Sequence, residues 1–323
     1  MTGDEHYMRR AMSLAASVRG TTSPNPWVGS VVEPGGFEGA TSAPGGPHAE
    51  VHALRAAGAS ARGATLYATL EPCAHTGRTA PCVDHIVDAG IARVVVGIED
   101  PDERVQGAGI RALRAAGVAV DVGVCAEEVR DQLAPYLKHR RTGRPWVVLK
   151  LASSLDGRIA APDGSSRWIT GREARADAHR LRAESDAVIV GAGTVRADDP
   201  TLTVRHVDGR DPLRVVLGRA PAGARVHPAL ELDGDLGDVL DELGRRGVLQ
   251  AMVEGGAMVA GDFHRAGLVD RYVLYMAPAF FGGDDARPLF AGAGAPTIED
   301  LWRGRVVSVE RLGDDLRLEC SPA

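Results

Sequence analysis

The chain has 323 residues, of which 44% are hydrophobic and 25% charged, and its formal net charge is −6. These values describe an ordinary globular protein, and the length favours two domains. The acidic balance, without a basic or aromatic stripe, argues against nucleic acid or an anionic membrane as a partner. Four cysteines in a chain of this length do not form a disulfide framework. The sequence has no apolar signal segment and no membrane-spanning run, so we expect a cytoplasmic protein.

The first part of the chain alternates helical and strand patterns. The apolar spacing predicts helices over residues 4–18, 48–58, 81–90, 109–116 and 127–140. Short apolar runs bounded by turn residues predict strands over 28–32, 65–70, 93–98 and 118–122. This alternation favours a mostly parallel sheet with helices on both faces.

A basic, turn-prone stretch at residues 138–145 is interpreted as a solvated linker. It divides the chain into domains over 1–144 and 145–323. The second domain is again α/β. Its predicted strands cover residues 146–151, 187–190, 213–217, 249–253, 269–276, 306–310 and 316–319, and its predicted helices cover 172–183, 236–245 and 258–266.

His48 and two Pro-Cys pairs, which end at Cys73 and Cys82, carry the clearest chemistry in the chain. One histidine and two cysteines suit Zn²⁺, and three protein ligands leave the fourth position open, as in catalytic zinc sites. Glu50 is placed to carry protons for a zinc-bound water. His-x-Glu followed by Pro-Cys is the signature of zinc nucleoside and nucleobase deaminases. Polynucleotide deaminases, however, have Cys-x-x-Cys, whereas here eight residues separate Cys73 from Cys82.

The same residues allow other interpretations. A fourth ligand from His52, His75 or His85 would close a structural zinc site. Ordinary core packing is a weaker alternative, because two Pro-Cys pairs and His-x-Glu seldom coincide by chance. A polynucleotide deaminase with an accessory domain is disfavoured by the acidic chain and the cysteine spacing. A regulatory protein with one decayed domain is disfavoured by the intact motifs.

Three segments, residues 24–29, 45–50 and 70–82, resemble the deaminase half of the RibD family of bifunctional riboflavin biosynthesis proteins. The second domain resembles the reductase half of that family, which is similar to dihydrofolate reductase. The matching segments are residues 150–157, 165–170, 191–195, 197–205 and 253–256. The resemblance implies a cytidine-deaminase-like αβα sandwich followed by a dihydrofolate-reductase-like α/β domain.

The resemblance also implies a function in two steps. The first is zinc-dependent hydrolytic deamination of 2,5-diamino-6-(5-phosphoribosylamino)pyrimidin-4(3H)-one. The second is NADPH-dependent reduction of the ribosyl side chain, which gives 5-amino-6-(5-phosphoribitylamino)uracil. The family further implies a homo-oligomer, either a dimer or a tetramer. A deaminase with a degenerate reductase domain, or an unrelated nucleic-acid or nucleotide zinc deaminase, is the alternative.

Site residues follow from the resemblance position by position. The zinc ligands are His48, Cys73 and Cys82, and Glu50 is catalytic. The substrate-binding positions are Asn25, His75, Arg78 and Thr79 in the first domain and Ser166, Arg182, Leu202, Arg205 and Glu254 in the second. The NADPH positions are Ala152, Trp168, Thr194, Asp198, Gly256, Ala257, Met258, Val259, Ala260, Gly261 and Asp262. Lys150 and Asp156 are motif residues for which a proton donor and an internal ion pair both stay open.

Elementary chemistry agrees with parts of this assignment. Arg182 and Arg205 can each hold a phosphate bidentately, and Gly255-Gly256 between a strand and a helix suits a cofactor pyrophosphate. Two regions, residues 33–47 and 219–237, are short against the family pattern. We therefore expect a trimmed hairpin in the first region. In the second, the preference for NADPH over NADH is less secure than reductase activity itself.

Overall fold

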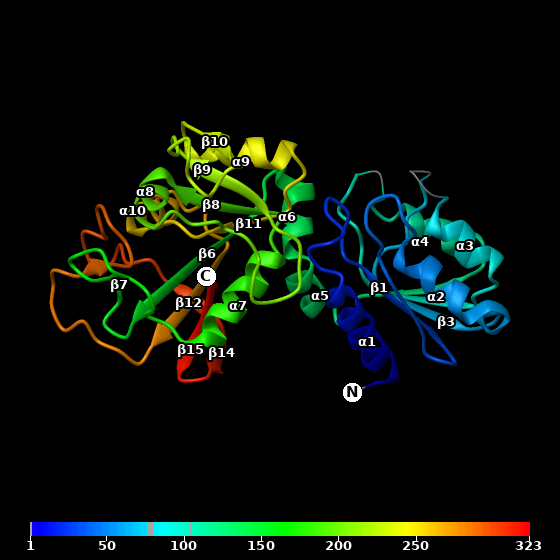
Figure 1. The fold of residues 1–323 in the computed structure, drawn as a ribbon. Helices are drawn as coiled ribbons and strands as arrows, with labels where there is room; N and C mark the ends of the chain where they lie inside the picture. Colours follow the sequence, from blue (N-terminus) through cyan, green and yellow to red (C-terminus); the bar gives the residue numbers. More distant parts are fainter. Residues whose placement is uncertain (1, 76–79, 104) are drawn as a thin grey trace. The chain divides into compact units, whose positions relative to one another are not determined.

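The fold is that of a computed structural model, which describes residues 2–75, 80–103 and 105–323. The chain divides into two compact units, Met1–Gly143 and Arg144–Ala323 (Figure 1). We call them the N-terminal and C-terminal units. Residues 138–142, which were predicted to belong to a linker, lie inside helix α6 (Ala134–Thr142), because the helix continues to a left-handed Gly143. No helix of the described residues is long and apolar enough to cross a membrane.

A five-stranded sheet in the order β2-β1-β3-β4-β5 forms the centre of the N-terminal unit. Its strands are β1 (Gly29–Glu33), β2 (Phe37–Ala40), β3 (Thr65–Leu70), β4 (Arg93–Ile98) and β5 (Ala119–Val122). Strands β3, β4 and β5 are parallel, whereas β1 is antiparallel to both β2 and β3. The sheet is therefore mixed rather than mostly parallel. The β1–β2 hairpin, expected to be trimmed, is formed over four residue pairs.

Helices cover both faces of this sheet (Figure 1). They are α1 (Gly3–Ser17), α2 (Ala49–Ala57), α3 (Cys82–Asp88), α4 (Ala108–Ala115), α5 (Ala126–Gln132) and α6, with a short 3₁₀ turn η1 (Gly58–Ala61). Helices α2, α3 and α4 bury Leu54, Ile86 and Leu113 in one core. Helix α1 packs on β1 and β3, and α5 packs on β4. The single helix predicted over 127–140 is two helices, because Pro135 in the first turn of α6 starts a new one after Leu133.

The C-terminal unit contains an eight-stranded sheet in the order β10-β9-β8-β11-β6-β12-β15-β14. Its strands are β6 (Trp146–Ser154), β8 (Ala187–Gly191), β9 (Leu213–Leu217), β10 (Leu230–Leu232), β11 (Gln250–Val253), β12 (Arg271–Ala277), β14 (Gly304–Leu312) and β15 (Asp315–Pro322). Strands β10 to β12 in this order are parallel, and β15 and β14 are added antiparallel. Strands β7 (Arg158–Ala160) and β13 (Arg287–Pro288) form a separate pair.

Four helices pack on this sheet: α7 (Arg172–Ala183), α8 (Ala192–Asp198), α9 (Leu236–Arg245) and α10 (Ala257–Arg265). Helices α9 and α10 bury Leu240 and Phe263 against one face, and α7 buries Leu181 against the other. Strands β2, β7, β10 and β13 and helix α8 were not predicted, because each is seven residues or shorter and has too few apolar residues for a period. The short region 219–237 thus holds strand β10 and, within these fully described residues, no helix before α9.

Candidate active sites

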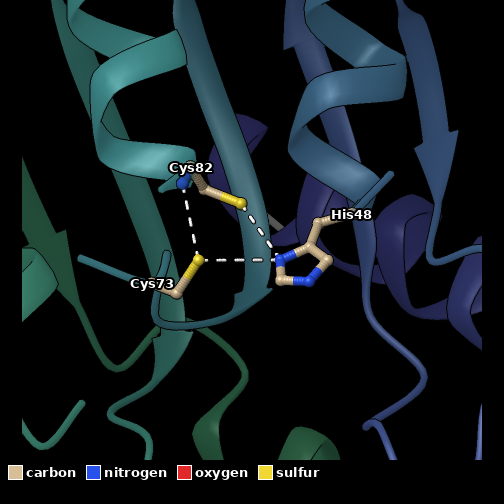
Figure 2. Close-up of side chains that lie close together, drawn as sticks. All are labelled: His48, Cys73 and Cys82. Carbon is tan, nitrogen blue, oxygen red and sulfur yellow. Dashed lines mark hydrogen bonds between the residues drawn. The ribbon is translucent and has the colours of Figure 1, made fainter. Parts of the chain in front are cut away.

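His48, Cys73 and Cys82 come together in the N-terminal unit, as Figure 2 shows. His48 caps the start of α2, Cys73 follows β3, and Cys82 is the first residue of α3. The His48 Nδ1 atom lies 3.2 Å from Cys82 Sγ and 3.6 Å from Cys73 Sγ. In a tetrahedral zinc site, Zn–N and Zn–S bonds of about 2.0 and 2.3 Å place the nitrogen and sulfur about 3.5 Å apart. These three side chains therefore fit a zinc ion.

The chemical state of the Cys73 thiol supports this fit, whereas the Cys82 thiol, which donates to Cys73, has a raised pKa. The Cys82 thiol, together with the Cys82 amide at 3.4 Å and the His48 ring, lowers the pKa of Cys73 to about 4. A thiolate is the form that binds metal. Among the described residues, the cluster has three protein donors, and His52 is instead hydrogen-bonded to the Ser42 hydroxyl. Three donors leave one tetrahedral position for a reacting molecule.

Glu50 lies in the first turn of α2 and is 3% exposed. Burial raises the pKa of its carboxyl above the usual value. A pocket of about 450 Å³ is lined by Glu50, His48 and Cys73, and also by two of the predicted substrate-binding residues, Asn25 and His75. The other two, Arg78 and Thr79, lie outside the described residues. The pocket can therefore present a small substrate to the zinc ligands and to a buried acid.

Glu71, just before the first Pro-Cys pair, has a role that sequence reasoning missed. Its buried carboxylate accepts hydrogen bonds from the backbone N–H groups of Gly107, Gly109 and Ile110 at 2.9 to 3.1 Å, and from that of Asp100 at 3.2 Å. A Cβ atom on Gly109 would lie 1.9 Å from the Pro72 carbonyl oxygen, so only glycine permits this approach. Glu71 thus fixes the segment that carries Cys73 against the start of α4. The glutamate directly before the first Pro-Cys pair was the available signal.

Asp100, at the end of β4, lines the same pocket and was also missed. The Tyr136 hydroxyl donates to both carboxylate oxygens of Asp100 at 3.1 Å, and the Asp102 amide donates to Oδ1 at 2.9 Å. Burial raises the pKa of Asp100 to about 6. Because the carboxyl ends of parallel strands β3 and β4 meet at one sheet edge, the Asp-Pro-Asp run after a buried strand was the signal for this residue.

This pKa shift predicts a pH dependence. The folded protein holds the Asp100 proton more tightly than the unfolded chain, so unfolding releases a proton between about pH 4 and 6. As the pH rises through this window, Asp100 therefore lowers the free energy of unfolding by up to about 3 kcal/mol. This loss of stability remains at higher pH. Asp100→Asn should remove that component, so the variant should gain stability relative to wild type as pH rises from 4 to 7.5. Urea denaturation at both pH values measures it; a constant difference would contradict the prediction.

In the C-terminal unit, Lys150 on β6, Arg182 on α7 and Glu254 after β11 form a buried ionic cluster. Arg182 donates from Nε and Nη2 to the two carboxylate oxygens of Glu254 at 2.8 and 3.0 Å, and from Nη1 to the Thr203 carbonyl at 2.6 Å. The Lys150 ammonium lies 3.9 Å from Glu254. Although burial opposes it, Arg182 and Lys150 hold the pKa of Glu254 below its usual value, and burial lowers the pKa of Lys150.

Asp156 has a different environment from Lys150. Its carboxylate accepts the Ser154 hydroxyl and the backbone N–H groups of Phe281 and Gly282 at 3.0 and 2.9 Å. These contacts lower the pKa of Asp156, the Ser154 hydroxyl most strongly. Asp156 therefore fastens the segment after β12 to the end of β6. The ion pair left open by the sequence belongs to Lys150, not to Asp156.

The other predicted positions of this unit surround the carboxyl ends of the parallel strands. Thr194 on α8 accepts a hydrogen bond from the Gly256 amide at 3.2 Å. Trp168 is 68% exposed, beneath the Arg175 guanidinium at 4.6 Å from the ring centroid. Arg167 donates to the Asp198 carbonyl at 2.8 Å. The Trp168 side chain is thus largely exposed, whereas the Gly256 amide is held by Thr194.

The remaining positions divide into exposed and buried ones. Val259 and Asp262 on α10 line a cleft of about 900 Å³, together with Gly191 and Gly193. Arg205 donates from Nη1 to the Thr201 and Thr203 hydroxyls. Leu202, Ala260 and Gly261 are buried, and Ala260 belongs to the hydrophobic core. Ser166 precedes α7, Ala152 lies within β6, and Ala257 and Met258 begin α10.

Each of the two units matches a known protein family. The family described as RibD C-terminal domain matches residues 145–318, and the cytidine and deoxycytidylate deaminase zinc-binding region matches residues 1–98. The riboflavin biosynthesis protein RibD of Escherichia coli (strain K12) is 38% identical, over 98% of this chain and 98% of that protein. RibD of Mycobacterium tuberculosis (strain ATCC 25618 / H37Rv) is 43% identical, over 97% of this chain and 96% of that protein.

Two solved structures are similar to this chain over nearly its whole length. Acinetobacter baumannii RibD, form 1, has a TM-score of 0.93 at 38% identity, covering 99% of both chains. A diaminohydroxyphosphoribosylaminopyrimidine deaminase/5-amino-6-(5-phosphoribosylamino)uracil reductase from Thermotoga maritima has a TM-score of 0.90 at 34% identity, again covering 99% of both chains. The predicted fold class, a deaminase-like αβα sandwich followed by a reductase-like α/β domain, is confirmed.

Proposed function

Because this chain belongs to the RibD family of bifunctional riboflavin biosynthesis enzymes, which use zinc and NADPH, we propose that its two halves catalyse consecutive steps. Residues 1–144 would deaminate 2,5-diamino-6-(5-phosphoribosylamino)pyrimidin-4(3H)-one. Residues 145–323 would then reduce the ribosyl group of the product and give 5-amino-6-(5-phosphoribitylamino)uracil. The observation that carries the proposal is the His48, Cys73 and Cys82 cluster with buried Glu50 in one pocket.

In the deaminase half, His48, Cys73 and Cys82 would hold zinc, which supplies an activated water when bound. Glu50 takes the proton of that water and gives it to the ring nitrogen. Glu50 then carries a proton to the departing amine, so a C–O bond forms, the C–N bond breaks and ammonia leaves. Asn25 would orient the pyrimidine, and His75, Arg78 and Thr79 would contact the substrate.

In the reductase half, NADPH supplies the hydride, and one proton completes the addition of two hydrogens to the ribosyl group. Glu254, Ser166, Leu202 and Arg205 would position the substrate. Arg182 would hold Glu254 with two of its five N–H groups and the Thr203 carbonyl with a third, and its remaining N–H groups would contact the substrate. The residues that would bind NADPH are Ala152, Trp168, Thr194, Asp198, Gly256, Ala257, Met258, Val259, Ala260, Gly261 and Asp262. Lys150 stands beside Glu254 as a candidate proton donor.

Zinc removal tests the deaminase assignment. After dialysis against a chelator, ammonia release from the diaminopyrimidinone should stop, and added Zn²⁺ should restore it. Binding of NADPH, followed by fluorescence titration, should be unchanged, since it depends on the other half. Full deamination by protein that metal analysis shows to be zinc-free would contradict the assignment.

We also propose that the enzyme acts in the cytoplasm as a homo-oligomer, a dimer or a tetramer. Strand β14 is the outermost strand of its sheet, and Val306 and Val309 on it are 62% and 59% exposed. Exposed apolar side chains on an unpaired edge strand are costly for an isolated chain. Light scattering measures the oligomeric state through the molar mass. Val309→Lys should lower the molar mass relative to an oligomeric wild type. A monomeric wild type would contradict the proposal.

A further inference from the structure

Arg140 lies in the stretch that the sequence suggested was a solvated linker, yet it lines the deaminase pocket from helix α6. Its side chain is 23% exposed. Among the pocket-lining residues that the structure describes, it is the one lysine or arginine. Arg140 is separate from the metal cluster, and its guanidinium makes another part of the pocket lining positively charged.

Three neighbours fix the direction of this guanidinium. It lies over the Tyr136 ring, 5.1 Å from the centroid, and the hydroxyl of that ring is held by Asp100. Its Nε atom lies 3.7 Å from Asp102 Oδ2. Its Nη2 atom donates to the Pro24 carbonyl at 3.1 Å. A side chain held in this way loses little further entropy when a ligand binds.

Most N–H groups of Arg140 donate no hydrogen bond within the described residues and can bind a ligand. A guanidinium has five N–H groups, and Pro24 takes one of them. In the described part of the chain, no other hydrogen-bond acceptor is recorded for Arg140, and Asp102 stands on the Nε side. The N–H groups of Nη1 and one N–H of Nη2 therefore remain, and neighbouring N–H groups of a guanidinium can bind two oxygens of a phosphate.

We propose that Arg140 binds the phosphate group of the deaminase substrate, an inference that rests on the proposed function. The pyrimidine amine must reach the zinc ligands, so the phosphoribosyl arm has to extend along another part of the pocket. Arg140 meets that arm with a fixed positive charge. Asp102 keeps the guanidinium oriented, and in a chain of net charge −6 a phosphate has to be held by local cations.

The test compares deamination of the phosphorylated substrate and of its dephosphorylated form. Arg140→Met should raise KM for the phosphorylated substrate roughly 10- to 100-fold with little change in kcat, as expected for the loss of a charged hydrogen-bonding partner. KM for the dephosphorylated form should change less than about 3-fold. Arg140→Lys should be intermediate, because it keeps the charge but loses the fork. The control Arg141→Met, the same change at the next, exposed residue, should leave both KM values unchanged.

A merely structural role through Pro24 or Asp102 would raise KM equally for both substrates, and that result would overturn the proposal. Unchanged KM values in Arg140→Met would overturn it as well. Binding of ribose 5-phosphate, measured by calorimetry on wild type and Arg140→Met, is a second readout that needs no turnover. If wild type fails to deaminate the diaminopyrimidinone, the proposed function fails. Because the reductase half would also bind this group, loss or weakening of one of the ribose 5-phosphate sites in the variant would then still support Arg140 as a phosphate ligand, and an unchanged number and affinity of sites would refute it.

Discussion

Replacing Glu50 with glutamine is expected to lower the rate of deamination by about 10² to 10⁴-fold, which is the usual contribution of general acid–base catalysis. Glutamine keeps the size of the side chain and its hydrogen-bonding reach, but it cannot take a proton from water and return it to the substrate. Glu50 is not one of the three clustered zinc donors, so zinc content should stay at the wild-type value. The measurements are ammonia release and metal analysis on the same preparation.

Asp84→Asn is the matched control for Glu50→Gln. Asp84 lies two residues after Cys82 in the first turn of α3, and it is exposed. The same acid-to-amide change there should leave both activity and zinc content unaltered. Wild-type deamination by a zinc-loaded Glu50→Gln enzyme would show that another group carries the proton. Loss of zinc from the variant would instead give Glu50 a role in holding the metal.

Replacing Glu254 with glutamine is expected to lower the free energy of unfolding of the C-terminal unit by about 3 to 5 kcal/mol. The change removes the negative partner of two buried cations, Arg182 and Lys150, and an uncompensated buried charge carries this cost. Reduction should fall at least 10-fold, because Glu254 would also lose its contact with the substrate. Urea denaturation and NADPH oxidation measure the two effects.

Glu310→Gln provides the comparison for Glu254→Gln. Glu310 on β14 is paired with Arg317, but its side chain is 52% exposed. An exposed ion pair contributes about 0 to 1 kcal/mol, so this variant should resemble wild type. Deamination should be unchanged in both variants. Equal stability of Glu254→Gln and Glu310→Gln would show that the buried cluster is not held by the charge of Glu254.

Local patterns were sufficient for most of the fold. Helix α7 and strand β9 were predicted residue for residue, because α7 has a helical apolar period that starts after Gly171 and β9 is an apolar run that ends before Gly218. The zinc cluster was also predictable, because in each Pro-Cys pair the proline indicates a turn and the cysteine supplies a metal ligand. Strand β2 was not predicted, and its hairpin with β1 was expected only in trimmed form, since a four-residue strand with glycine and an acidic residue has no apolar period.

The contacts that sequence reasoning missed join residues that lie far apart in the chain. Arg140 meets Asp102 and Pro24 only because α6 returns to the pocket, and a run of basic residues by itself is typical of a solvated segment. Glu254 meets Lys150 because β11 and β6 are neighbours in the sheet, although four other strands and three helices separate them in sequence. Strand order of this kind is decided by packing of the whole sheet, not by any local pattern.

One measurement tests the central claim, that a single chain carries out deamination and then reduction. The purified protein is incubated with the diaminopyrimidinone phosphate, with and without NADPH, and the product mass is followed. We predict exchange of an amine for oxygen without NADPH, and the further addition of two hydrogens when NADPH is present. Deamination without reduction would contradict the assignment of the C-terminal half. An unchanged mass with zinc-loaded protein would contradict the claim as a whole.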